Sequence, residues 1–114
     1  MIRAGLAAFL TLAVSAWGAT SPQEEAAFQR VVVVMKQIKA ANRNPASVAW
    51  EEVWSNSDAS VVCVDYRGQN GFGGMNRELI VVVKDKAHRT PQAWNRHCTK
   101  PGMRDFLFAR HALR

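Results

Sequence analysis

Two cysteines, Cys63 and Cys98, are the residues of this chain with the most restricted chemistry. In an oxidising compartment an even pair usually forms a disulfide. Two alternatives are a pair of buried free thiols and a zinc site that also uses His88 and His97. Because no Cys-x-x-Cys or His-x-x-x-His spacing supports a zinc site, a disulfide is predicted if the chain is exported.

The glycine-rich segment 68–74 could bind through its backbone. Glycines let a chain approach another surface closely, and successive amides can hold an anion. No Gly-Lys-Ser/Thr follows, and the next pattern is a strand, so neither a phosphate-binding loop nor a dinucleotide fingerprint is predicted. Strand patterns on both sides favour a long hairpin connection with a glycine bulge. The candidate binding loop comprises Asn70, Gly71, Phe72, Gly73 and Gly74.

Side chains for acid–base chemistry are present but match no catalytic motif. Asp65 and the histidines His88, His97 and His111 could exchange protons. The chain has no serine-nucleophile motif and no His-Glu-x-x-His, so each histidine is predicted to be a surface residue. We therefore expect no enzymatic activity, no metal and no cofactor. The alternative is a small hydrolase whose site lies near the 68–74 loop and uses Asp65 or a histidine.

Positive charge is concentrated at the C-terminal end of the chain, whose formal net charge is +6. A basic surface suits an acidic membrane surface or an acidic protein, whereas a solvated face without a partner is the commoner outcome. Nucleic acid is not an expected partner of an exported chain. The candidate basic surface comprises Lys84, Lys86, Arg89, Arg96, Lys100, Arg104 and Arg110.

The first residues resemble a secretory signal. Arg3 supplies a positive start, 4–14 is an apolar run without charge, and 15–19 is rich in small residues. The alternative is a membrane anchor, but the run is shorter than the roughly 20 residues that a spanning helix needs. A signal peptide at 1–19 predicts a periplasmic or secreted protein. The remainder, 20–114, is long enough for one small domain without a transmembrane span.

The patterns that must position these residues predict an α+β fold. Ser21, Pro22 and Glu24 cap a helix over 22–41, whose apolar face includes Phe28, Val31, Val32, Met35 and Ile38. Strands at 48–54, 60–67 and 78–83 predict a three-stranded antiparallel meander.

Trp50 and Trp54 fall on one side of the first strand pattern. Together with Trp94 they are expected to pack the helices onto the sheet. A second helix is expected over 90–98, with Thr90 as its cap. Residues 99–114 form a basic C-terminal extension outside the part closed by the disulfide. Within this extension, the apolar pattern of residues 103–114 fits either a helix or a strand.

The order of these motifs resembles a group of small exported proteins of Gram-negative bacteria without an assigned function. The shared elements are Pro45-Ala46-Ser47, Trp50, Val62-Cys63, Asn70-Gly71-Phe72-Gly73-Gly74, Leu79 to Val83 and Trp94-Asn95-Arg96-His97-Cys98. The resemblance covers about residues 32–98 and implies the same disulfide and fold, but no catalytic residue. This chain has Val64 where the group usually has glycine, and it continues beyond the second cysteine.

Together these observations predict an exported envelope protein that acts by binding. Its expected partner is another envelope protein, such as a secreted effector that it neutralises, or an acidic membrane surface. Besides the hydrolase, a structural accessory of a secretion or pilus apparatus is a second alternative to this binding protein.

Overall fold

The computed structural model describes residues 21–113, so the signal peptide predicted at 1–19 lies outside the described residues. One long α-helix, a five-stranded sheet, a short α-helix and two 3-10 helices make up this part of the chain. In chain order the elements are α2 (Pro22–Ala41), η2 (Pro45–Ser47), β1 (Ala49–Ser55), β2 (Val61–Gln69), β3 (Met75–Val83), β4 (Lys86–His88), α3 (Pro91–His97), β5 (Arg104–Asp105) and η3 (Leu107–Ala112), where η denotes a 3-10 helix.

Helix α2 begins and ends where its sequence predicts. The Ser21 hydroxyl accepts a hydrogen bond from the Glu24 amide at 3.1 Å, and Pro22 occupies the first helical position. Val31 and Met35 are fully buried on the face that packs against the sheet. Among residues 21–113, no helix has both the length and the apolar character needed to cross a membrane.

The sheet is antiparallel throughout, with the strand order β4-β3-β2-β1-β5. Its three central strands are the predicted meander, but the prediction of three strands was wrong because β4 and β5 extend the two edges. These edge strands are 3 and 2 residues long, and all their residues are exposed. Such short exposed strands bury no face, so they leave no alternating pattern in the sequence.

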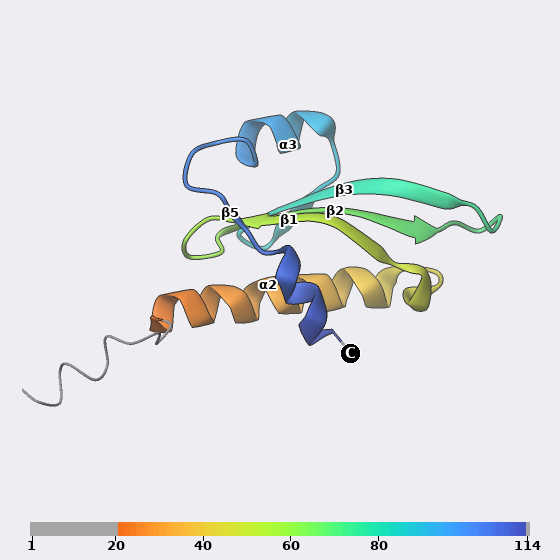
Figure 1. Cartoon of the computed structure of the whole chain (residues 1–114). Coiled ribbons are helices and arrows are strands. Elements are labelled where there is room, and N and C mark those ends of the chain that lie inside the picture. The colour runs from red at the N-terminus through yellow and green to blue at the C-terminus, as the bar shows by residue number, and fades with distance from the viewer. Residues whose placement is uncertain (1–20, 114) are drawn as a thin grey trace, which may run out of the picture.

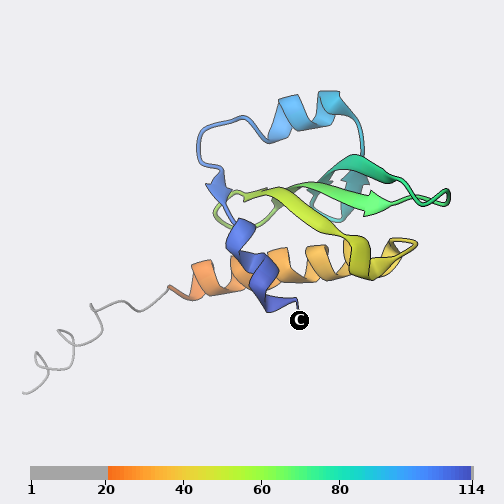
Figure 2. The same cartoon turned by 45° about the vertical axis from the view of Figure 1, so that its right-hand side comes forward.

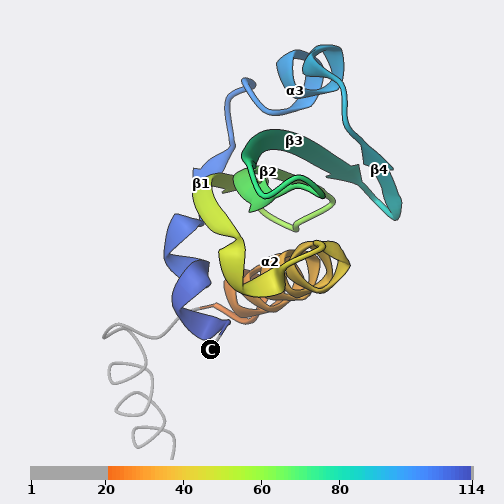
Figure 3. The same cartoon turned by 90° about the vertical axis from the view of Figure 1, so that its right-hand side faces the viewer.

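Helices cover both faces of the sheet (Figures 1 and 3). On one face, Val62, Val64 and Ile80 form the main core with α2 and η3. On the other face, Cys63 and Val81 form a smaller cluster beneath α3. Residues that alternate along β2 therefore belong to two different cores, which explains why this strand is apolar on both sides.

The first strand carries a β-bulge that changes which way its tryptophans face. Trp50 pairs with Tyr66 and Glu52 pairs with Asp65, so Glu51 has no partner of its own. Trp50 consequently packs against the main core, whereas Trp54 packs against the disulfide cluster. The expectation that both lie on one side was wrong because the extra residue reverses the alternation.

The C-terminal residues 103–113 are part of the domain. Arg104 and Asp105 pair as β5 with β1, and after Phe106 the six residues Leu107–Ala112 form η3. Ala109 is fully buried and Phe106 is 8% exposed in the main core. The segment that the sequence left open between helix and strand therefore contains one short element of each kind, and it closes one side of the core.

Candidate functional site

The predicted disulfide is confirmed between Cys63 and Cys98, with a Cα–Cα distance of 6.1 Å. It joins the central strand β2 to the residue that ends α3. Trp54 and Trp94 pack around it on the sheet face opposite α2. The bridge therefore fixes α3 against the sheet.

Strands β2 and β3 form a long hairpin whose tip is the candidate binding loop. The two strands pair residue by residue from Val61 and Val83 to Gln69 and Met75. In Figure 2 the tip projects beyond the end of α2, away from the layers that cover the rest of the sheet. The hairpin predicted from the glycine-rich segment is thus present, and its loop spans residues 70–74.

Asn70 organises this loop through a set of short hydrogen bonds. Its side-chain oxygen accepts from the amides of Phe72 at 2.9 Å and Gly74 at 3.0 Å. The backbone amide of Asn70 donates to the Gly74 carbonyl at 2.8 Å. Gly73 has a φ of 86°, a conformation that glycine adopts without strain. The loop is therefore held in one shape by its own residues.

The most exposed large apolar side chain of the described residues is at this tip. Phe72 is 99% exposed, and Met75 beside it is 49% exposed. Asn70 orders the backbone of the loop, so the Phe72 ring projects from a backbone of fixed shape. A rigidly presented aromatic side chain is typical of a contact residue.

The loop end of the hairpin is fastened to the segment that follows α2. Asn44 donates to the Gln69 side-chain oxygen at 2.7 Å, and the Ser47 hydroxyl accepts from the Gln69 amide at 2.9 Å. A Cβ on Gly68 would lie 2.1 Å from the side-chain nitrogen of Asn42, so the two segments are in close contact there. These contacts position the hairpin relative to the main core.

Two ion pairs lie on the hairpin face opposite α2. Arg77 donates from Nε to both oxygens of Asp65, at 3.0 and 3.2 Å, and the Asp65 side chain is only 1% exposed. The hydrogen bonds to Asp65, and then its negative charge, raise the pKa of Arg77. Arg67 pairs with Glu51 at 2.7 Å, with both side chains close to half exposed.

We predict that Asn70→Ala loosens the loop with little effect on the rest of the domain. The variant loses the acceptor that holds the Phe72 and Gly74 amides, and both groups lie on the surface where water replaces it. The expected loss of global stability is about 1 kcal/mol or less. Hydrogen exchange at the Phe72 and Gly74 amides should accelerate by at least about tenfold. Unchanged exchange at these two amides would contradict the described role of Asn70.

The structure does not bring the acid–base candidates to the loop. Asp65 is buried and engaged by Arg77. His88 and His97 line a cavity of about 240 Å³ beside α3. His88 pairs with Val81, toward the end of β3 that is remote from the loop, and His111 lies in η3. Within residues 21–113, no three His, Cys, Asp or Glu side chains are grouped closely enough to hold a metal ion.

The predicted basic residues are all exposed but are divided between different parts of the molecule. Lys84 and Lys86 lie at the β3–β4 turn, on the edge of the sheet opposite Arg104 of β5. Arg104 pairs with Glu24 at 3.6 Å, and Arg89 donates to the Tyr66 hydroxyl at 3.4 Å. Arg110 belongs to η3, whereas Arg96 and Lys100 lie in and after α3. The five strands thus separate charges that are close in sequence.

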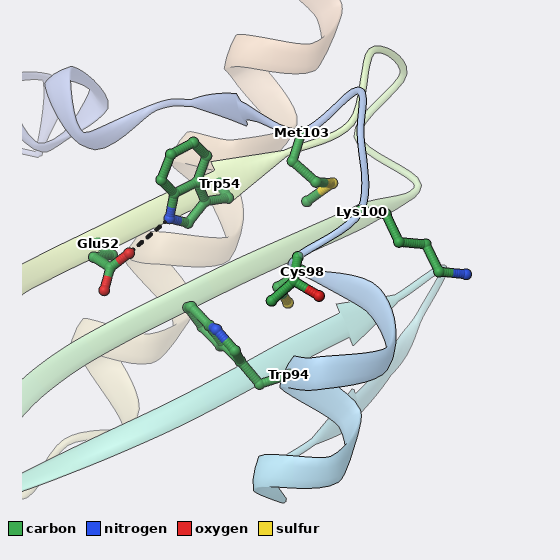
Figure 4. A pocket seen from close by; sticks show the side chains of 7 residues that line it. Glu52, Trp54, Trp94, Cys98, Lys100 and Met103 are labelled. Atoms are coloured by element: carbon green, nitrogen blue, oxygen red, sulfur yellow. Dashed lines mark hydrogen bonds between the residues drawn. The ribbon is translucent and has the colours of Figure 1, made fainter.

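Sequence reasoning missed a cleft between β1 and α3, where Trp54 and Trp94 were interpreted as packing residues only. The cleft has a volume of about 330 Å³ (Figure 4). It is lined by Glu52, Trp54, Trp94, Cys98, Thr99, Lys100 and Met103. The spacing of Trp94 and Cys98, one helical turn apart, was the one signal that could have placed Trp94 beside the disulfide.

Comparisons of this chain with protein-family models, with curated proteins and with solved structures found no match.

Proposed function

We propose that this chain is a non-enzymatic binding module of the bacterial cell envelope that docks on a partner protein through the hairpin tip. The observation that carries the proposal is Phe72, which is 99% exposed on a loop ordered by Asn70. Ordering the loop before binding lowers the entropy cost of association. An aromatic side chain that enters a partner's pocket typically dominates the binding energy of its interface.

A protein partner suits the tip better than a membrane. Burial of one phenylalanine contributes about 1.5–3 kcal/mol, which is too little to hold a protein on a bilayer by itself. The hairpin arginines Arg67 and Arg77 are already paired with carboxylates, so they add little attraction for anionic lipid. A concave protein surface can bury the Phe72 ring completely and form hydrogen bonds with the polar residues around it.

The location in the envelope rests on the sequence and on the disulfide. The segment 1–19 has the composition of a cleavable signal. A buried disulfide is favoured in oxidising compartments such as the periplasm. The resemblance to small exported proteins of Gram-negative bacteria supports the same location. Catalysis at the loop is not favoured, because Asp65 is paired with Arg77 and the pair His88 and His97 lines a cavity beside α3.

The proposal is tested by photo-crosslinking of the full chain in the producing bacterium. Phe72 is replaced by p-benzoylphenylalanine, and the same residue is placed at Val33 in a control chain. Val33 is 50% exposed on α2, so it reports encounters that do not involve the tip. We expect a discrete protein adduct from position 72 and none from position 33.

Competition then separates a specific contact from a collision. Added wild-type protein should abolish the adduct, and the Phe72→Ser variant should compete at least about tenfold less well. Equal adducts from positions 72 and 33 would overturn the proposal. Adducts to lipid alone would overturn it in favour of a membrane contact.

A further inference from the structure

The disulfide links the two segments that carry the tryptophans lining the cleft, Trp54 and Trp94. Cys63 is the register partner of Trp54 in the β1–β2 pair. Cys98 lies one turn after Trp94, and its amide donates to the Trp94 carbonyl at 2.8 Å. One covalent link therefore joins the neighbours of both indoles, which come from different elements of the fold (Figure 4).

Polar groups of opposite charge stand on two sides of these indoles. The Glu52 carboxylate accepts a hydrogen bond from the Trp54 ring nitrogen at 2.9 Å and lies beside the tryptophans. Thr99 and Lys100, which follow α3, also line the cleft, and Lys100 lies on the side away from Glu52 (Figure 4). The cleft thus combines apolar walls with an acceptor on one side and donors on the other.

We propose that this cleft binds a pyranose ring of a neutral saccharide. Such a ring has an apolar CH face, which can lie against an indole, and hydroxyl groups around its rim. Glu52 would accept from hydroxyl groups, and Lys100 and Thr99 would donate to them. A cavity of about 330 Å³ is in the range of small-molecule sites, which are typically apolar with a few placed polar groups.

The local charges favour a neutral ligand over a cation. Tryptophan attracts cations through its ring face, and a carboxylate would add to that attraction. However, Lys100 lines the same cleft as Glu52. Its positive charge offsets that of the Glu52 carboxylate, so the lining has no net negative charge to select a cation.

The test uses two neutral trisaccharides, tri-N-acetylchitotriose and maltotriose, titrated into the oxidised protein and followed by calorimetry and tryptophan fluorescence. We expect at least one to bind with a dissociation constant on the order of 0.1–1 mM. Trp94→Leu and Trp54→Leu should each weaken binding by at least about tenfold. Lys100→Met should weaken binding by at least about threefold. Because Lys100 is exposed, this variant should keep the stability of the wild-type protein.

Trp50→Phe is the matched control, because Trp50 lies on the opposite face of the sheet against Tyr66. It should leave the affinity unchanged, as should Phe72→Ser at the hairpin tip. Absence of binding by both trisaccharides at about 10 mM would overturn the proposal. So would binding that survives both Lys100→Met and Trp94→Leu. Binding of tetramethylammonium alone, weakened by Glu52→Gln, would overturn it in favour of a cation site.

Discussion

Replacement of both Cys63 and Cys98 by alanine is expected to lower the free energy of unfolding by about 3–4 kcal/mol. The bridge joins residues 35 apart in sequence, so it removes much of the freedom of the unfolded chain. Small domains are stable by only about 5–15 kcal/mol in total. The loss is therefore a large part of the stability of this domain.

The loss should appear first at α3. This helix has seven residues, none of them buried, and isolated helices shorter than about 12–15 residues are marginal in water. Its support consists of the Thr90 cap, which accepts from the Ala93 amide at 3.2 Å, the bridge at Cys98, and the packing of Trp94 around that bridge. Without the bridge, amides of α3 should exchange faster at denaturant concentrations where α2 is still protected.

Urea unfolding and intact mass measure this prediction together. The oxidised protein should take up no alkylating reagent until it is reduced, and the mass also tests removal of residues 1–19. Wild-type protein with its thiols reduced is the matched control, since it keeps both side chains and loses only the bond. If the reduced and oxidised proteins unfold at the same urea concentration, the prediction that the bridge stabilises the domain is wrong.

The features that the sequence predicts well are those with local causes. The Ser21 cap and Pro22 mark the start of α2, and Thr90 marks the start of α3, through contacts within one helical turn. Of the central strands, β2 and β3 contain continuous apolar runs, at 61–64 and 79–83, because both of their faces are covered there. The loop at 70–74 was identified because asparagine and glycine encode its turn locally.

The features that it predicts poorly depend on contacts between distant segments. The bulge at Glu51 appears only when β1 is paired with β2, and it decides that Trp54 faces α3. The short strands β4 and β5 exist because an existing sheet offers them an edge. Likewise, the cleft needs β1, α3 and the loop to Met103 in place, and no single segment contains its pattern.

The pairing of the arginines is another non-local feature, and it has a measurable consequence. Arg67 and Arg77 are directly opposite each other on β2 and β3, where two like charges would destabilise the sheet. Each is neutralised by its own carboxylate, but the two carboxylates differ in burial. Asp65 is 1% exposed, whereas Glu51 is 41% exposed. The two ion pairs should therefore respond differently when the arginine is removed.

Replacement of Arg77 by leucine is expected to be strongly destabilising, whereas Arg67→Leu should have little effect. Loss of Arg77 leaves the Asp65 carboxylate buried without a counter-ion, and such a group costs on the order of 3–5 kcal/mol. Loss of Arg67 leaves Glu51 in contact with water, and exposed ion pairs contribute about 1 kcal/mol at most. Urea unfolding of the two single variants gives the comparison.

The cause of the loss is tested by also removing the buried charge. Asp65→Leu should be milder than Arg77→Leu, because the Arg77 side chain is 58% exposed and can be hydrated when its partner is gone. The double variant, Asp65→Leu with Arg77→Leu, should then recover most of the stability lost in Arg77→Leu. A double variant that is as unstable as Arg77→Leu would show that the arginine acts through packing of its stem instead. Recovery would instead identify the buried carboxylate as the reason that the hairpin depends on Arg77.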